Sequence, residues 1–336
     1  MVCASCREPI TGRYLQVGRL TFHPEHFRCQ ACGQVIVGSF HTHQGAFLHP
    51  ACYAERHAPR CGVCETPITD RYVEHEGRAV HAHCYGKHYA ARCDVCRRAI
   101  VGTWLKDHWG HVYHAEHQRE FATCLYCGRL CHDAIGGGGV RYPDGRAICR
   151  LCHRTAVHRE GDVARTVEAI RQRMAGWGVD LEAIQVPVQT VDRHRLGQLL
   201  GRSHAGIKAV SGVAAMNWER HGREVRNKRA TVYLLHGLPL LWLEGTAAHE
   251  LMHVWNFHHG PPHAFELEEG SCNYMSYRVH QEQGGEMAAY HVDCLLKDPH
   301  PAYGAGFRRV KRLVERRGFD QLLVLLQRSR DFPLLD

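Results

Sequence analysis

The second half of the chain carries the periodicity of amphipathic helices. Apolar side chains recur at intervals of four and three at Val163, Val167, Ile170, Met174 and Trp177, which predicts a helix with one buried face. Further helical stretches are expected at residues 266–282, 285–297, 305–316 and 319–329.

Two segments of this half have the pattern of strands. AIQVPVQTVD, residues 183–192, is strand-like, but Pro187 lacks an N–H and confines this strand to a sheet edge. RATVYLLHG, residues 229–237, is rich in β-branched and aromatic residues. The pattern therefore predicts an α+β fold for this half, mainly helical, with one small sheet packed against the helices.

The first 152 residues show short alternating segments instead. GRYLQVGRLTFH, GSFHTHQGAFLH, DRYVEHEGRAVH and GTWLKDHWGHVYH each predict a short β-hairpin. Units of this size bury too little apolar surface to fold alone, so bound metal must supply much of the folding free energy.

The cysteines supply the ligands for that metal. Fifteen of the seventeen precede residue 153, mostly as C-x-x-C pairs. The N-terminal stretch MVCASCREPI has no features of a secretory signal, so we expect a cytoplasmic protein and interpret the pairs as zinc ligands rather than disulfides. Five sets of four ligands recur in phase: Cys3, Cys6, His23 and His26; Cys29, Cys32, His49 and Cys52; Cys61, Cys64, His81 and Cys84; Cys93, Cys96, His114 and His117; and Cys124, Cys127, Cys149 and Cys152.

These sets group into larger modules. Only Phe27 and Arg28 separate the first two, and the combined spacing resembles a LIM domain, with His26 at a position where that family most often has cysteine. We expect a LIM-like double module at residues 1–56, a single module at 57–91, a second LIM-like double module at 92–154, and a separate domain at 163–336. Cys131 and His132 are spare in the fifth set and are alternative ligands there. By resemblance, LIM domains bind proteins.

Charge and hydropathy argue against other classes of partner. The net charge is +8, but the basic residues are scattered, which favours a solvated surface over a nucleic-acid site. The longest apolar run, near residues 238–243, is far too short to cross a membrane.

The sequence GTAAHELMHVW contains the motif H-E-x-x-H at His249, Glu250 and His253. Two histidines four residues apart lie on one face of a helix and can bind one zinc ion, and the glutamate between them can act as a general base. Two residues compete for the third ligand. His259 completes a metzincin-like spacing, with Asn256 in place of glycine, whereas Glu269, with fifteen residues between it and His253, fits a gluzincin.

A family resemblance favours Glu269. The segments HGLPLL, AHELMH, EEG and YGAGF, within residues 185–335, resemble the LIM-containing, ubiquitin-activated zinc peptidases of the DA-one family. The resemblance implies one catalytic zinc held by His249, His253 and Glu269, besides about five structural zinc ions. In this alignment Met275 is an ordinary helix residue and Asn273 can hydrogen-bond a ligand histidine.

The expected function is therefore that of an intracellular zinc metalloendopeptidase. Glu250 is the expected base, the candidate oxyanion donors are Tyr274, Tyr277, His280 and His291, and the strand ATVYLL at 230–235 is expected to pair with an extended substrate. His258 and His263 are expected on the surface or behind the ligands.

The expected partners are a protein substrate and, by the family resemblance, ubiquitin or a ubiquitylated protein. The alternative is a non-enzymatic LIM-type adaptor with a degenerate peptidase domain, against which the presence of Glu250 argues.

Overall fold

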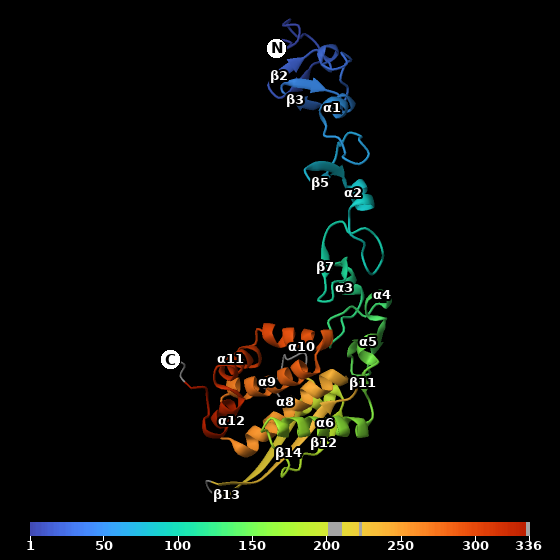
Figure 1. The fold of residues 1–336 in the computed structure, drawn as a ribbon. Coiled ribbons are helices and arrows are strands. Elements are labelled where there is room, and N and C mark those ends of the chain that lie inside the picture. Colours follow the sequence, from blue (N-terminus) through green and yellow to red (C-terminus); the bar gives the residue numbers. More distant parts are fainter. Residues whose placement is uncertain (201–209, 222–223, 334–336) are drawn as a thin grey trace. The chain divides into compact units, whose positions relative to one another are not determined.

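The computed structural model describes residues 1–200, 210–221 and 224–333, so the predicted domain at 163–336 has three stretches outside the description. The chain divides into two compact units, Met1–Trp104 and Leu105–Asp336, which are drawn together in Figure 1. None of the described helices combines the length and the apolarity needed to span a bilayer.

The first unit is built from the predicted hairpins. Its elements are β1 (Leu15–Val17) paired with β2 (Leu20–Phe22), η1 (Pro24–His26), β3 (His41–His43) paired with β4 (Ala46–Leu48), α1 (Pro50–His57), β5 (Tyr72–His75) paired with β6 (Arg78–His81), and α2 (Ala82–His88). Each C-x-x-C pair here is followed by a residue with a left-handed backbone, four positions after the first cysteine. The repeat seen in the sequence is therefore a repeat of backbone conformation.

The second unit holds the remaining elements. They are β7 (Trp104–Lys106, which begins at the boundary), β8 (Val112–His114), α3 (His117–Glu120), α4 (Asp133–Gly136), β9 (Gly139–Arg141), β10 (Ala147–Cys149), α5 (Arg150–His153), β11 (Ala156–Val157), α6 (Glu160–Gly176), β12 (Val188–Val191), α7 (Arg193–Leu200), β13 (Gly212–His221), β14 (Glu224–Leu235), β15 (Leu238–Pro239), α8 (Leu240–His259), α9 (Phe265–Gln283), α10 (Gly285–Lys297), the π-helical turn η3 (Pro301–Gly306), α11 (Phe307–Arg317) and α12 (Phe319–Arg328). The predicted helices are confirmed to within a few residues.

The main sheet has three strands in the order β12-β14-β13. β12 follows Pro187, runs parallel to β14 and lies at an edge, as predicted. The expectation that ATVYLL pairs with substrate is wrong, because β14 is the central strand and hydrogen-bonds neighbours on both sides. The antiparallel edge strand is β13, which was missed because its sequence, GVAAMNWERH, lacks a strong strand pattern.

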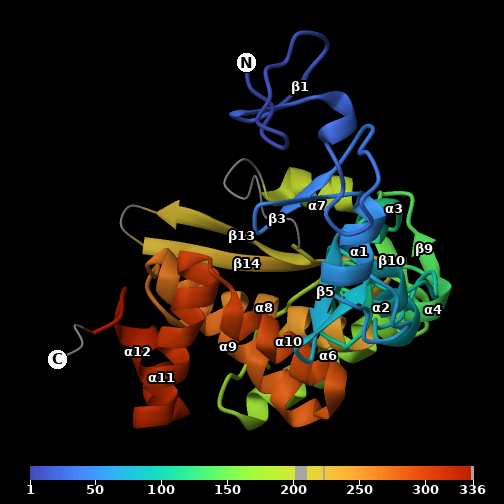
Figure 2. The same ribbon diagram turned by 90° about the horizontal axis from the view of Figure 1, so that it is seen from above.

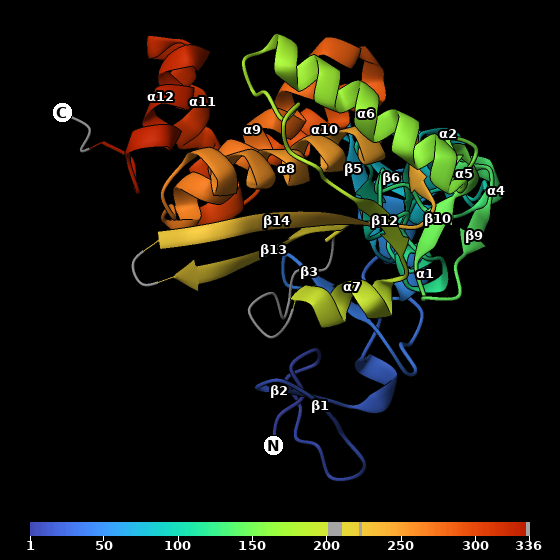
Figure 3. The same ribbon diagram turned by 90° about the horizontal axis from the view of Figure 1, so that it is seen from below.

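Helices cover both faces of this sheet. Figures 2 and 3 show α7 on one face and α8 on the other, with α9 and α10 beyond α8. Because α8 lies between the sheet and α9, residues on its two sides face β13 and α9 respectively.

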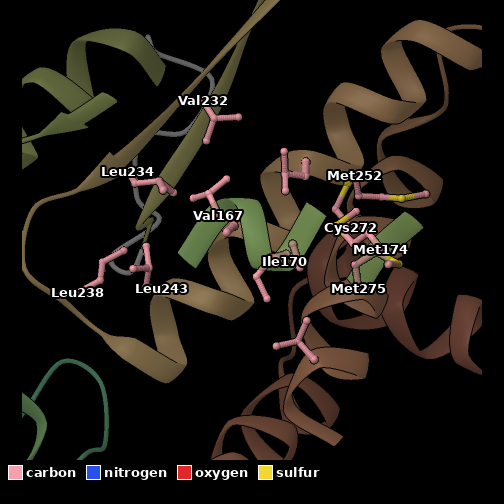
Figure 4. Close-up of a cluster of buried hydrophobic side chains, with 14 of the residues drawn as sticks. Val167, Ile170, Met174, Val232, Leu234, Leu238, Leu243, Met252, Cys272 and Met275 are labelled. Atoms are coloured by element: carbon pink, nitrogen blue, oxygen red, sulfur yellow. The ribbon is translucent and has the colours of Figure 1, made fainter. Parts of the chain in front are cut away.

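One hydrophobic core holds the second unit together. Val167, Ile170 and Met174 of α6 pack with Val232 of β14 and Met252 of α8 (Figure 4). The same core includes the fifth set of cysteines, with Tyr126 and Ile148. The spacing of the cysteines predicts a module separate from the following domain, because spacing alone does not show that the apolar residues of the module belong to the core of that domain.

Candidate active site

Helix α8 places the H-E-x-x-H motif. The helix begins after Pro239, and its first N–H, from Leu240, donates to the carbonyl of Thr155 at 2.8 Å. Twelve residues separate Leu240 from His253, which completes the motif, and the helix is continuous throughout. Its four-residue spacing puts His249 and His253 on one face, with their ring centroids 4.9 Å apart.

Helix α9 adds Glu269 to this pair. Nε2 of His249 lies 3.2 Å from Nε2 of His253, and Oε2 of Glu269 lies 3.3 Å from the former and 3.6 Å from the latter. A tetrahedral zinc ion with bonds of about 2.0–2.1 Å holds its ligand atoms about 3.3 Å apart. Oε2 of Glu269 is buried without a hydrogen-bond partner in the described part of the chain. The three atoms therefore fit a zinc ion.

The other nitrogen of each histidine ring is held by α9. Nδ1 of His249 donates to Oδ1 of Asn273 at 3.0 Å, as the resemblance implied, and Nδ1 of His253 donates to Oε1 of Glu268 at 2.7 Å. These bonds fix the rings and leave each Nε2 available to a metal.

Glu268 is in turn held by His263, whose side chain is almost wholly buried. Nδ1 of His263 donates to Oε2 of Glu268 at 2.7 Å, and Nε2 donates to the carbonyl of Leu326 in α12, also at 2.7 Å. Both neighbours are acceptors, so both ring nitrogens carry protons and the ring is cationic. His263 thus lies behind the ligands, connecting His253 to the last helix.

The hydrogen bonds of this network lower the pKa values of Glu268 and Glu269. Burial alone would raise the pKa of both carboxyls, but His253 and His249 hold the pKa of Glu269 far below its usual range. Hydrogen bonds from His253 and His263 likewise lower the pKa of Glu268 to about 2. Both groups are therefore carboxylates at neutral pH, which suits a cation.

Glu250 lies on the side of α8 that faces β13. It is buried, and burial raises its pKa, while the neighbouring histidines act in the opposite direction. A hydrogen bond with the backbone of Ala214 holds the carboxylate against β13. Gly212 lies close enough that an added Cβ would sit 3.0 Å from Oε1 of Glu250. A carboxyl with a raised pKa beside the two histidines suits a proton acceptor.

His259 does not join the ligands. α8 continues unbroken through Asn256, whose amide donates to Ser271 at 3.2 Å, and His259 is the last residue of the helix. It lies about 9 Å further along the axis than His253, at 1.5 Å per residue. Its ring stacks on Trp255. The metzincin spacing requires the helix to end at Asn256, which it does not do.

The four expected oxyanion donors make other contacts in this structure. Tyr274 packs on Phe319 and Tyr277 on Phe307, with ring centroids 5.9 and 5.4 Å apart. His280 and His291 form a separate buried pair; in the described residues, Nδ1 of His280 and both nitrogens of His291 lack a hydrogen-bond partner.

Tyr303 of η3 lies near the carboxylates of the site and was not singled out in the sequence. Burial raises the pKa of Tyr303, and the nearby charges of Glu269 and Glu250 raise it further. Its carbonyl accepts from Nδ2 of Asn273 at 2.9 Å. The only signal in the sequence was the segment YGAGF, which carried the resemblance without assigning a role to its tyrosine.

The structural ligand sets also come together. In the first, second, third and fifth sets, the four candidate atoms lie within 4.8 Å of one another, so each set fits a tetrahedral zinc ion. In the fourth set, Cys93 and Cys96 precede the boundary between the two units and His114 and His117 follow it. Cys131 and His132 are not needed in the fifth set, whose four cysteines are all buried.

The chain is also similar to known proteins. Residues 3–57 match the LIM domain family. The chain is 24% identical to Protein DA1-related 2 of Arabidopsis thaliana, over 99% of this chain and 70% of that protein, and 24% identical to Protein DA1 of the same plant, over 99% of this chain and 68% of that protein. A shorter match, 44% identical over 59 residues, relates 17% of this chain to 13% of human PDZ and LIM domain protein 7.

Proposed function

We propose that this chain, a LIM domain protein homologous over nearly its whole length to the DA1 and DA1-related proteins, is a zinc metallopeptidase that cleaves protein substrates. The observation that carries the proposal is the convergence of His249, His253 and Glu269 on one point, with Glu250 beside it. Three protein ligands and an open fourth position are typical of catalytic rather than structural zinc.

The roles of the residues follow from their positions. A zinc ion held there would polarise water and the carbonyl of the scissile peptide bond. Glu250 takes the proton of the attacking water and passes it to the leaving amine. The hydroxyl of Tyr303 donates a hydrogen bond to the oxygen that becomes negative.

The edge strand β13 is the substrate platform in this proposal. The N–H of Leu235 donates to the carbonyl of Ser211, so Ser211 and Leu235 form a hydrogen-bonded pair across β13 and β14. Pairing alternates in an antiparallel ladder, so Gly212, Ala214 and Met216 direct their N–H and C=O groups away from β14. The N–H of Ala214 is bonded to Glu250, so the groups proposed to pair with substrate are its carbonyl and those of Gly212 and Met216. An extended peptide can add to this edge directly beside Glu250.

The LIM-like modules are proposed to bind a partner protein. Ubiquitin, or a ubiquitylated protein, is the candidate that the family resemblance suggests. The second candidate function, a non-enzymatic adaptor, would need only these modules and no general base.

The substitution Glu250→Gln separates the two functions. It keeps the shape of the side chain and leaves the zinc ligands intact, so we expect six zinc ions per chain in both the wild type and the variant, measured by elemental analysis. Cleavage of a protein substrate should fall by a factor of about 10²–10⁴. Unchanged cleavage would remove Glu250 from the chemistry, and undiminished biological activity would favour the adaptor.

A further inference from the structure

The fifth zinc module, residues 122–153, holds the turn from which the catalytic helix begins. Nη2 of Arg146 donates to the carbonyl of His236 at 2.7 Å, and the hydroxyl of Tyr142 donates to the carbonyl of Gly237 at 3.4 Å. β11, just after the module, pairs with β15, just before α8. The start of α8 is therefore built on this module.

Trp242 lies where the module, the helix and the sheet meet. It occupies the first turn of α8, and its ring centroid is 5.3 Å from that of Tyr126, a fully buried residue of the fifth module. The Tyr126 hydroxyl accepts from Arg146 at 2.9 Å, so the ring against Trp242 is itself held in place.

Trp242 also reaches the edge strand. Its indole Nε1 donates to Oγ of Ser211 at 2.8 Å. Ser211 directly precedes Gly212, the residue that packs against Glu250 and begins the outward-facing backbone of β13. The bond thus fixes the beginning of β13 relative to the first turn of α8.

We propose that Trp242 is a positioning residue, which couples the zinc-bound fifth module to the substrate-binding edge of β13. The inference rests on the proposed function for the role of that edge. It assigns the fifth module to the peptidase, because the described core of the second unit includes its cysteines and no residue of the first three modules. The ligand whose binding depends on Trp242 is an extended peptide substrate.

Two mild substitutions test the coupling. Ser211→Ala and Trp242→Phe each remove the hydrogen bond while keeping most of the packing. We expect KM to rise about 2- to 10-fold, the effect of one net hydrogen bond, with kcat changed less than about twofold and six zinc ions retained. The double variant should be no worse than either single variant, because both remove the same bond.

A matched pair of cysteine variants tests the link to the module. Cys127→Ser and Cys64→Ser change the second cysteine of the fifth and third knuckles, and each should cost one zinc ion. Only Cys127→Ser should raise KM. If Cys127→Ser does not fold, Tyr126→Leu takes its place, because it removes the ring that packs against Trp242. The control for Tyr126→Leu is Val63→Ala in the third module.

Amide hydrogen exchange tests the coupling independently of catalysis. Exchange at Val213 and Leu235, whose N–H groups lie within the β13–β14 ladder, should quicken in Ser211→Ala and Trp242→Phe. It should remain unchanged in Trp177→Phe, an indole that packs on Arg278 instead. If exchange quickens in these variants but the wild type cleaves no substrate, the proposed function is wrong and the coupling through Trp242 still holds. Three results would overturn the coupling. They are unchanged KM and exchange in the single variants, additive effects in the double variant, and equal effects of Cys127→Ser and Cys64→Ser on KM.

Discussion

Gly212 and Glu250 approach each other so closely that no side chain fits between them. A Cβ built on Gly212 would lie 2.9 Å from Cγ of Glu250, 3.0 Å from its Oε1, and 2.8 Å from Cγ2 of Thr246. Glycine is therefore required for the edge strand and the catalytic helix to meet at this distance. The position of the proposed base is set by the backbone of β13 as well as by α8.

The substitution Gly212→Ala should displace Glu250 or push β13 away from α8. A displacement of about 1 Å at a catalytic group can cost about 100-fold in rate, so we expect kcat to fall by that order. The zinc ligands face α9 instead, so the catalytic zinc should remain. The matched control is Gly197→Ala in α7, where an added Cβ meets no atom within 4 Å. Equal activity of both variants with the wild type would contradict the proposed contact.

The third ligand predicts a contrast between two substitutions. Glu269→Gln removes the carboxylate that lies 3.3 Å from His249, so the catalytic zinc should be lost while the cysteine-bound zinc stays. His259→Ala should change neither, because that ring stacks on Trp255 at the end of α8. Elemental analysis of both variants decides the matter: loss of one zinc from His259→Ala and none from Glu269→Gln would restore the metzincin interpretation.

The helices and the ligand sets could be read from the sequence because their signals are local. The four-residue spacing of His249 and His253 and the repeated C-x-x-C pairs each specify neighbours on one short element. β13 could not be read in this way, because small and polar residues become a strand only by pairing with β14. Tyr303 was missed for a related reason: it reaches the site only through the packing of η3 on α9.

The relay behind His253 predicts zinc affinity. Glu268→Gln and His263→Phe each break the chain of hydrogen bonds from His253 to Leu326, so the catalytic zinc should bind about 10- to 100-fold more weakly. Competition with a chromogenic chelator measures this affinity without any substrate.

The control for the relay is Glu266→Gln, three residues before Glu269. Glu266 pairs with Arg309 at 3.2 Å and takes no part in the relay, so its variant should bind zinc like the wild type. Should Glu266→Gln release zinc as easily as Glu268→Gln while His263→Phe binds zinc like the wild type, the weakening would reflect loss of negative charge near the site and not the hydrogen-bonded chain.

The buried pair His280 and His291 predicts sensitivity to acid. Their ring centroids are 4.9 Å apart, and burial lowers the pKa of His280 to about 3 and that of His291 to about 4. The neighbours that face them, Trp242 and Gly245 of α8 and the backbone of Tyr126, carry no charge. Both rings are therefore neutral in the folded protein at pH 5, whereas histidine in the unfolded chain has a pKa near 6.5.

The sign of the effect follows from proton uptake. Below about pH 6.5 the unfolded chain binds protons that the folded protein does not, so the free energy of unfolding falls with pH by up to about 1.4 kcal/mol per pH unit for each histidine, until the folded pKa is reached. His291→Phe keeps a ring against Trp242 and removes one of these groups. Between pH 7 and pH 5 it should therefore lose about 2 kcal/mol less stability than the wild type, measured by urea unfolding followed by circular dichroism.

His194→Gln, at an exposed position of α7, should lose as much stability as the wild type. Zinc release on acidification affects all three proteins alike and cancels in this comparison, so equal losses in the wild type and His291→Phe would show that the pair does not stay neutral.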